Sequence, residues 1–180
     1  MRNFVPYWCN GAAVKTPDGK NGTTYDAGLY DGYELVEELG RGIAKIRPTN
    51  YGQYELWNHC GDDLRHNENN WYDISRLTYN RPASKGGSET YFGKPVERKF
   101  VSDTMRCYFS FPTVKVLIYK DDLNKGKTPT GGFTDQYVFR LAETYLMRAE
   151  ANYWLGNIPA ATADVNEIRK RAKAPELFTV

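Results

Sequence analysis

The sequence predicts a mainly α-helical protein: one tetratricopeptide-like unit of an α-α superhelix, joined to a loop-rich region with a few short strands. Two observations predict this fold class. Residues 135–173 repeat apolar side chains at helical spacing on both sides of a tight turn. The residues before them carry frequent glycine and proline and only short apolar runs. We therefore expect a loop-rich region over 1–133, a helical hairpin over 134–174 and a tail over 175–180.

The first helix of the hairpin is expected from about Asp135 to Leu155. Its main apolar stripe has a period near 3.6 residues and should face the core; the stripe consists of Val138, Leu141, Ala142, Tyr145, Ala149 and Tyr153. Met147, Ala151 and Trp154 gather on roughly the opposite side. A helix that is apolar on two faces is expected between neighbours, so one partner helix cannot cover it.

A tight turn and a second helix should follow. Gly156 and Asn157 tolerate the left-handed backbone of a helix C-terminus, and Pro159 fits the first turn of a helix. The second helix is expected from about Ile158 to Lys173, before Pro175. Its contact stripe consists of Ala161, Val165, Ile168 and Ala172, and the residues expected to point outward are Asp164, Glu167, Lys170 and Arg171. Alanine at these contacts would let the two backbones approach closely.

The sequence contains only one such unit. Helical solenoids need at least about three units before their buried faces are satisfied. The chain ends at Val180, soon after this unit, and the first helix has no obvious neighbour for its second face. We therefore expect the chain to be a fragment of a larger protein.

The loop-rich region should contain short elements only. Pro17-Asp18-Gly19 and Asn21-Gly22 are turn signals and predict a hairpin or an exposed loop within 15–32. Thr49 or Asn50 can cap a helix that runs to about Trp57. The other expected elements are helical turns over 33–39, a short strand or extended link over 42–47, strands over 74–79 and 113–119, a surface loop over 82–95 and a linker over 124–133.

The helical segment carries a family resemblance. Residues 140–151 (RLAETYLMRAEA), followed by Gly156-Asn157, Ala160-Ala161 and residues 166–172 (NEIRKRA), resemble the C-terminal helical signature of the SusD/RagB family. Upstream, residues 40–49 (GRGIAKIRPT), 63–65 (DLR) and 79–82 (YNRP) are similar to segments that precede the signature in some members. The resemblance covers most of residues 30–173, and its helical part is the more diagnostic.

The resemblance implies a non-catalytic, glycan-binding component of nutrient uptake in Bacteroidetes-type bacteria. Such a protein would be lipid-anchored at the surface of the outer membrane, and its partners would be an oligosaccharide or polysaccharide and a TonB-dependent transporter. Members are longer than this chain, with a signal peptide, a lipid-modified cysteine and further helix pairs. Residues 1–9 lack the apolar core of a signal peptide, and Cys9 is not in a convincing lipidation context, so we expect that the export signal lies outside this chain.

Composition agrees with sugar binding and argues against nucleic acid. The formal net charge is +2, from 24 basic and 22 acidic residues without long runs, so no polyanion-binding surface is expected. The chain has 14 tyrosines, whose rings and hydroxyls suit both faces of a sugar. The candidate ligand-binding residues are Trp57, Trp71 and Tyr72, because they lie in the polar region where a ring can be exposed. The alternative is that these rings pack beneath the loops.

No enzyme motif is present. A glycosidase needs two carboxylates on opposite sides of a sugar bond, and the acidic pair at 62–63 is adjacent in the chain. Glu143 and Glu150 lie on one helix flank, interleaved with Arg140 and Arg148, and are expected to form ion pairs. Neither a phosphate-binding loop nor a nucleophile elbow occurs. The sequence therefore predicts no catalytic residue and no cofactor.

The segment 59–66 concentrates possible metal ligands. His59, Cys60, Asp62, Asp63 and His66 match no known structural spacing, so we expect no metal and instead a hydrogen-bonded turn, braced by Asp63 and Arg65. The three cysteines form no framework, and the sequence does not say whether one pair is bridged.

A second hypothesis is a protein-interaction scaffold without sugar binding, in which the helical repeat holds a partner chain. Glycosidase activity is the third. Retardation in gels that contain glycans would favour sugar binding, and binding only to a transporter or peptide would favour the scaffold.

Overall fold

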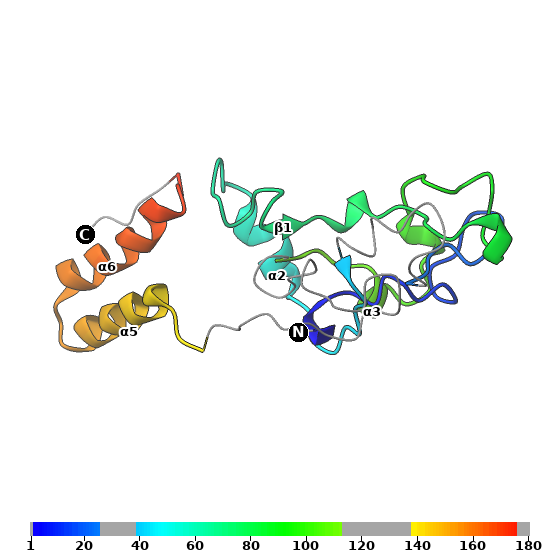
Figure 1. Cartoon of the computed structure of the whole chain (residues 1–180). Helices are drawn as coiled ribbons and strands as arrows, with labels where there is room; N and C mark the ends of the chain where they lie inside the picture. The colour runs from blue at the N-terminus through cyan, green and yellow to red at the C-terminus, as the bar shows by residue number, and fades with distance from the viewer. Residues whose placement is uncertain (1, 26–38, 113–137, 176–180) are drawn as a thin grey trace. The chain divides into compact units, whose positions relative to one another are not determined.

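The computed structural model describes residues 2–25, 39–112 and 138–175. They belong to two compact units, one formed by residues 1–55 and 68–134 and the other by residues 56–67 and 135–180. The short segment 56–67 thus joins the helical unit although it lies far from the helices in sequence. The prediction of a mainly helical protein with a helix pair, loop-rich regions and a small sheet is confirmed (Figure 1).

The first unit is built from short elements joined by loops. Its longest described helices have only one turn, and its strands have two residues each. The elements are η1 (Arg2–Phe4), α2 (Asn50–Gln53), the start of η2 (Glu55–Trp57), β1 (Trp71–Tyr72), η3 (Ile74–Arg76), η4 (Ala83–Lys85), η5 (Arg98–Phe100), α3 (Thr104–Cys107) and β2 (Phe111–Pro112).

A small aromatic and aliphatic core holds the first unit together. β1 and β2 pair antiparallel, with Trp71 opposite Pro112 and Tyr72 opposite Phe111. The fully buried side chains come from segments far apart in sequence; the largest apolar ones are Trp8, Tyr72, Tyr79, Phe109, Phe111, Leu39 and Leu77. Burial of such rings is the main favourable contribution to the folding of this unit, because its elements are too short to be stable alone.

Side chains supply many of the hydrogen bonds that regular structure would otherwise make. The Asn80 side chain accepts from the Thr24 amide at 2.9 Å and donates to the Thr24 carbonyl at 3.0 Å. The Trp8 indole donates to the Gly40 carbonyl at 2.9 Å. Buried backbone groups are costly when unpaired, so these contacts fix the loops over the core.

Several predictions for the loop-rich region are confirmed. The turn around Asp18 closes a small hairpin, because Lys15 and Asn21 form an antiparallel bridge. The Thr49 hydroxyl accepts from the Gly52 amide at the start of α2, as the capping pattern indicated. The predicted single helix to Trp57 is instead split, since α2 ends at Gln53 and η2 takes the chain onward.

Other predictions for this region are wrong or lie outside the described residues. Residues 74–79 do not form a strand: Asp73 accepts from the Ser75 amide and starts the turn η3, while the strand β1 lies earlier. Residues 42–47 form neither a strand nor an extended link, because Ala44 is left-handed (φ +55°) and a bend follows at 45–46. Residues 82–95 form a loop, as predicted, and it contains η4. The elements expected over 33–38, 113–119 and 124–133 lie outside the described residues.

The helical hairpin is present, with bounds that differ from the prediction at its start. α5 (Leu141–Trp154) begins after Arg140, whose backbone is extended (φ −132°, ψ 145°), and so starts about six residues later than expected. Gly156 is left-handed at φ +77°, and the Asn157 side chain accepts from the Ala160 amide at the start of α6 (Ile158–Arg171). The turn chemistry read from the sequence is therefore confirmed (Figure 1).

Alanines and one ion pair hold α5 against α6. Ala149, Ala161 and Ala172 are buried, as predicted. Asp164, expected on the outside, is also buried, and its carboxylate accepts from Arg148 Nε at 2.8 Å and Nη2 at 2.6 Å. The prediction for Asp164 is wrong because its place in the chain, three residues after Ala161, puts it on the contact face.

The Arg148 ion pair also corrects the pairing predicted on α5. The Arg148 guanidinium holds the pKa of the Asp164 carboxyl below its ordinary value, and the carboxylate raises the pKa of Arg148. Arg148 thus binds across the hairpin. No ion pair of Glu143 or Glu150 is found among the described residues.

α6 covers only part of the apolar surface of α5. Val138, Leu141 and Tyr153 were expected in the core but are 81%, 71% and 59% exposed. Met147 and Trp154, on the second face, are also exposed. α6 alone therefore does not cover both faces of α5, as expected for a single partner helix, and the assignment of those three residues to the core is wrong.

Candidate functional site

The segment 57–67, hereafter the Trp57 loop, is a chain of tight turns. The amide of Cys60 donates to the Trp57 carbonyl, that of Asp63 to the Cys60 carbonyl and that of His66 to the Asp63 carbonyl, at 3.0 to 3.1 Å. Gly61 is left-handed at φ +50°, which permits the change of direction. The prediction of a hydrogen-bonded turn is confirmed.

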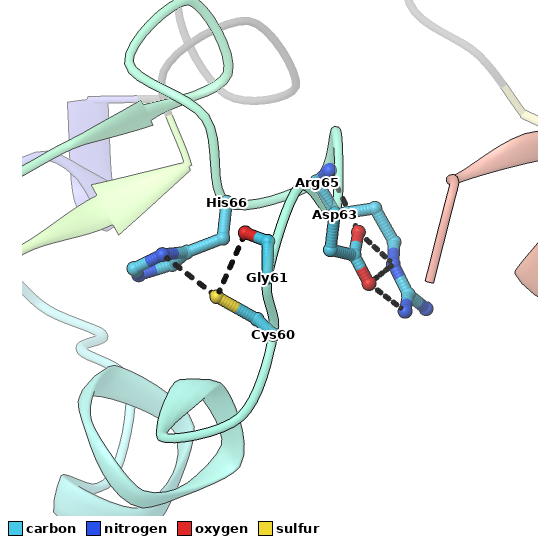
Figure 2. Close-up of polar contacts among 5 residues, drawn as sticks. All are labelled: Cys60, Gly61, Asp63, Arg65 and His66. Atoms are coloured by element: carbon cyan, nitrogen blue, oxygen red, sulfur yellow. Dashed lines mark hydrogen bonds and ion pairs between the residues drawn. The ribbon is translucent and has the colours of Figure 1, made fainter. Parts of the chain in front are cut away.

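Asp63 and Arg65 brace the loop, also as predicted (Figure 2). The buried Asp63 carboxylate accepts from the Arg65 amide at 2.9 Å, from Nε at 2.9 Å and from Nη2 at 2.5 Å. These donors lower the pKa of the Asp63 carboxyl and raise the pKa of Arg65. The pair engages Nε and Nη2 of the guanidinium and neutralises its charge.

The Trp57 loop is attached to the end of α6. The Leu64 amide donates to the carbonyl of Ala172 at 2.8 Å, a residue that follows the last turn of α6. The positive charge of Arg169 also favours the ionised form of Asp63. The last carbonyls of a helix lack partners within it, so this bond serves both segments. The sequence gives no sign of it, because the two residues are far apart in the chain.

Trp57 is held by its neighbours but keeps part of its surface in solvent. The His66 ring stacks on it, with centroids 4.7 Å apart and planes at 19°, and the Arg65 guanidinium carbon lies 5.9 Å from its centroid. Cys60 Sγ lies 3.8 Å from His66 Nδ1 on the other side of the loop strand from the Asp63 pair (Figure 2). These contacts hold the indole in one orientation.

The other two candidate rings are buried. Trp71 is 7% exposed and Tyr72 is 1% exposed, both in β1. The Tyr72 ring lies 5.9 Å from that of Phe111, and the Arg76 guanidinium lies 5.3 Å from its centroid. The alternative, that these rings pack beneath the loops, therefore holds for Trp71 and Tyr72, whereas Trp57 is partly exposed.

The described residues contain no group of three or more histidine, cysteine or acidic side chains that could hold a metal. Cys9, Cys60 and Cys107 form no disulfide bond with one another. Burial raises the pKa of the Cys107 thiol to about 12. Within the described part of the chain, no helix has the length and apolar character needed to cross a bilayer.

Comparison with protein families gives a match that extends beyond the helical hairpin to nearly the whole chain. Residues 12–179 match the SusD family. The chain belongs to the SusD family. SusD family proteins are non-catalytic binding proteins, so this protein is not an enzyme. Membership implies a glycan-binding partner of a TonB-dependent transporter and an outer-membrane lipoprotein. Neither the comparison with curated proteins nor that with solved structures found a match.

Two features of the site escaped the sequence analysis. The stack of His66 on Trp57 joins residues nine positions apart, and the spacing of three consecutive turns was the available signal for it. His66 had been considered only as a metal ligand. The bond between Leu64 and Ala172 had no signal in a single sequence.

Proposed function

We propose that this SusD family chain is a glycan-binding component of an outer-membrane uptake system that works with a TonB-dependent transporter. The observation that carries the proposal is the family match over 12–179. In its full-length form the protein would be lipid-anchored and exposed at the cell surface, where it would bind an oligosaccharide or polysaccharide before transport.

We propose Trp57 as the ring on which a sugar stacks. Its indole is oriented by His66 and Arg65 and is partly exposed, so little conformational entropy is lost on binding. The exposed side chains of Asn58 and Asp62 lie in the same loop and can bond to sugar hydroxyls. An aromatic face beside polar groups suits the mixed C–H and O–H surface of a carbohydrate.

The charges of the Trp57 loop favour a neutral glycan. Arg65 is neutralised by Asp63, whereas the Asp62 carboxylate is exposed. An anionic polysaccharide would meet the Asp62 carboxylate, and the one arginine of the loop is already paired with Asp63. We therefore propose neutral chains such as starch or xylan rather than uronic acid polymers as ligands.

Affinity electrophoresis tests this proposal. The chain is run in native gels that contain starch, xylan, mucin or polygalacturonate, and the expected result is retardation by a neutral glycan only. Trp57→Ala should abolish the retardation, and Trp57→Phe should retain part of it, because a smaller ring still stacks. Trp154→Ala is the matched control, an exposed tryptophan outside the loop.

The outcomes separate the hypotheses. Retardation that Trp57→Ala leaves intact would reject the proposed site but keep glycan binding. Mobility unchanged by every glycan, together with binding to a transporter or peptide, would favour the scaffold. Release of reducing ends from any of the glycans would contradict a non-catalytic role.

A further inference from the structure

Both helices of the hairpin end in a Schellman motif, in which two amides beyond the helix donate back to its last turn and the first of these residues is left-handed. After α6, the amides of Lys173 and Ala174 donate to the carbonyls of Lys170 and Arg169, both at 3.0 Å. The corresponding bonds after α5 are 3.0 and 2.8 Å long. The left-handed residue is Gly156 after α5, at φ +77°, but Lys173 after α6, at φ +54°.

Lys173 is an unfavourable residue for this position. A Cβ crowds a left-handed backbone, which is why glycine is usual there. Among the described residues other than glycine, only Ala44 and Lys173 have a positive φ. The side chain of Lys173 is exposed, so its burial does not favour the turn. Such a backbone persists where the surrounding contacts hold it.

On both sides of Lys173 the chain contacts the Trp57 loop. The Ala172 carbonyl accepts from the Leu64 amide at 2.8 Å. A Cβ added at Gly61 would lie 3.6 Å from both Cβ and Cγ of Pro175, so the proline ring lies directly beside Gly61. The left-handed turn thus sets residues 172 and 175 against two separate points of the loop.

The charge of α6 acts on the same part of the loop. Asp63 lies between those two points in the sequence, and the positive charges of Arg65 and Arg169 both lower the pKa of its carboxyl. Arg169 is also the residue whose carbonyl closes the Schellman motif of α6. The helix end and the loop therefore form one connected structure.

We propose that the α6 end, residues 172–175, positions Trp57 for sugar binding because it holds the Trp57 loop in the conformation of its three turns. The first turn begins at the Trp57 carbonyl, and the last joins the His66 amide to the Asp63 carbonyl. Since His66 also stacks on the indole, displacement of residues 61–64 would move the ring and its neighbour. The inference rests on the proposed sugar site at Trp57.

Two substitutions of one residue separate the backbone turn from the lysine side chain. Lys173→Val opposes the left-handed backbone because valine is β-branched, whereas Lys173→Gly removes the same side chain and permits that backbone. Pro175→Gly removes the ring beside Gly61. The matched control is Gly156→Val, which places valine at the left-handed end of α5, where an added Cβ would meet nothing within 4 Å.

Two measurements are made on the whole 180-residue chain. Amide hydrogen exchange, read by mass spectrometry on fragments that contain residues 57–67, reports how often the loop opens without any sugar. Affinity electrophoresis over a range of concentrations of the neutral glycan gives the dissociation constant. Circular dichroism verifies that each variant stays folded.

We expect Lys173→Val to speed hydrogen exchange in the loop and to weaken glycan binding about fivefold, because only the closed loop binds. Pro175→Gly should change both quantities in the same direction by a smaller factor. Lys173→Gly should restore both quantities to those of the unaltered chain. Gly156→Val should lower the stability of the hairpin and leave glycan binding as it was.

Unchanged exchange of the loop in Lys173→Val would overturn the inference, because the α6 end would not hold the loop. Faster exchange with unchanged glycan affinity would overturn its role in binding. Equal weakening by Lys173→Val and Gly156→Val would show a general loss of stability, and equal weakening by Lys173→Val and Lys173→Gly would assign the effect to the lysine side chain. If the unaltered chain binds no glycan, the proposed function fails, and hydrogen exchange alone then decides whether the α6 end positions the loop.

Discussion

Asp63→Asn tests whether a buried carboxylate holds the Trp57 loop to the helical unit. The substitution keeps the size of the side chain but removes its charge. It also places an amide NH2 where the Arg65 guanidinium now donates, so donor faces donor. The loop should loosen, and with it the bond from Leu64 to Ala172.

The expected loss follows from the geometry of Asp63. Its side chain is 3% exposed, and its carboxylate accepts one hydrogen bond from the Arg65 amide and three from the Arg65 guanidinium, of which Nε makes two. A hydrogen bond to a charged group contributes about 1.5 to 3 kcal/mol net. The Arg65 side chain is 36% exposed and can regain water, which keeps the loss below that of a fully buried pair. We expect the free energy of unfolding of the helical unit to fall by about 2 kcal/mol.

Urea denaturation followed by circular dichroism at 222 nm measures this loss, because α5 and α6 are the longest described helices. Asp62→Asn is the control: its neighbouring carboxylate is exposed, and its replacement should change stability by less than about 0.5 kcal/mol. Equal stability of Asp63→Asn and the unaltered chain would refute the reasoning. So would equal destabilisation by the two variants.

The pH dependence gives a second check on Asp63. Its pKa is held below the ordinary value of 3.8 by Arg65. A carboxyl whose folded pKa is lowered stabilises the fold above the unfolded pKa, and the contribution is lost as the pH falls through the folded value. The difference between the unaltered chain and Asp63→Asn should therefore be constant from pH 7 to about pH 4 and shrink below it. A difference that grows on acidification would contradict the assignment.

Two further predictions concern the thiols and a close backbone approach. At pH 8, the partly exposed Cys60 should react with a thiol reagent within minutes. The buried Cys9 and Cys107 should react only after unfolding. The pKa of Cys107, which burial raises to about 12, also keeps that thiol protonated. Gly42→Ala should destabilise the first unit by at least about 3 kcal/mol in chemical denaturation, because the added Cβ would lie 1.8 Å from the carbonyl oxygen of Pro6.

Each of these predictions has a clear control. Gly52→Ala places a Cβ no closer than 3.5 Å to its neighbours within α2 and should leave stability unchanged or slightly higher. If Gly42→Ala were equally harmless, the close approach to Pro6 would not exist in solution. Rapid labelling of all three cysteines in the folded chain would show that the core around Cys107 is open.

Local chemistry was the part of the fold that could be predicted. The turn at Gly156, the cap at Asn157 and the brace between Asp63 and Arg65 each depend on residues within a few positions, so their signals lie in a short stretch of sequence. Thr49 as the cap of α2 belongs to the same class. The side chains of Thr49, Asn157 and Asp63 each accept from a backbone amide two or three residues away.

The sequence-based predictions failed or stayed open where a residue contacts a partner far away in the chain, or where its burial determines its role. The strand expected over 74–79 followed an alternating pattern, but Asp73 bonded locally and formed a turn instead. For Trp71 and Tyr72 the sequence left two alternatives open, exposure to a sugar or packing beneath the loops, and the pairing of β1 with β2 buries both rings. Asp164 was predicted to point into solvent because it is charged. It is buried instead, because Arg148 on α5 pairs with its carboxylate.

The sequence by itself determined the helical hairpin, its turn, the second apolar face of α5 and membership of the SusD family, because periodicity and capping are properties of neighbouring residues. Only the tertiary structure decided that Trp57 is partly exposed while Trp71 is buried, and that the Trp57 loop is hydrogen-bonded to the end of α6 through Leu64. Exposure and long-range hydrogen bonds depend on which distant segments meet. A single sequence does not show which distant segments are in contact, because those contacts are decided by the packing of the folded chain.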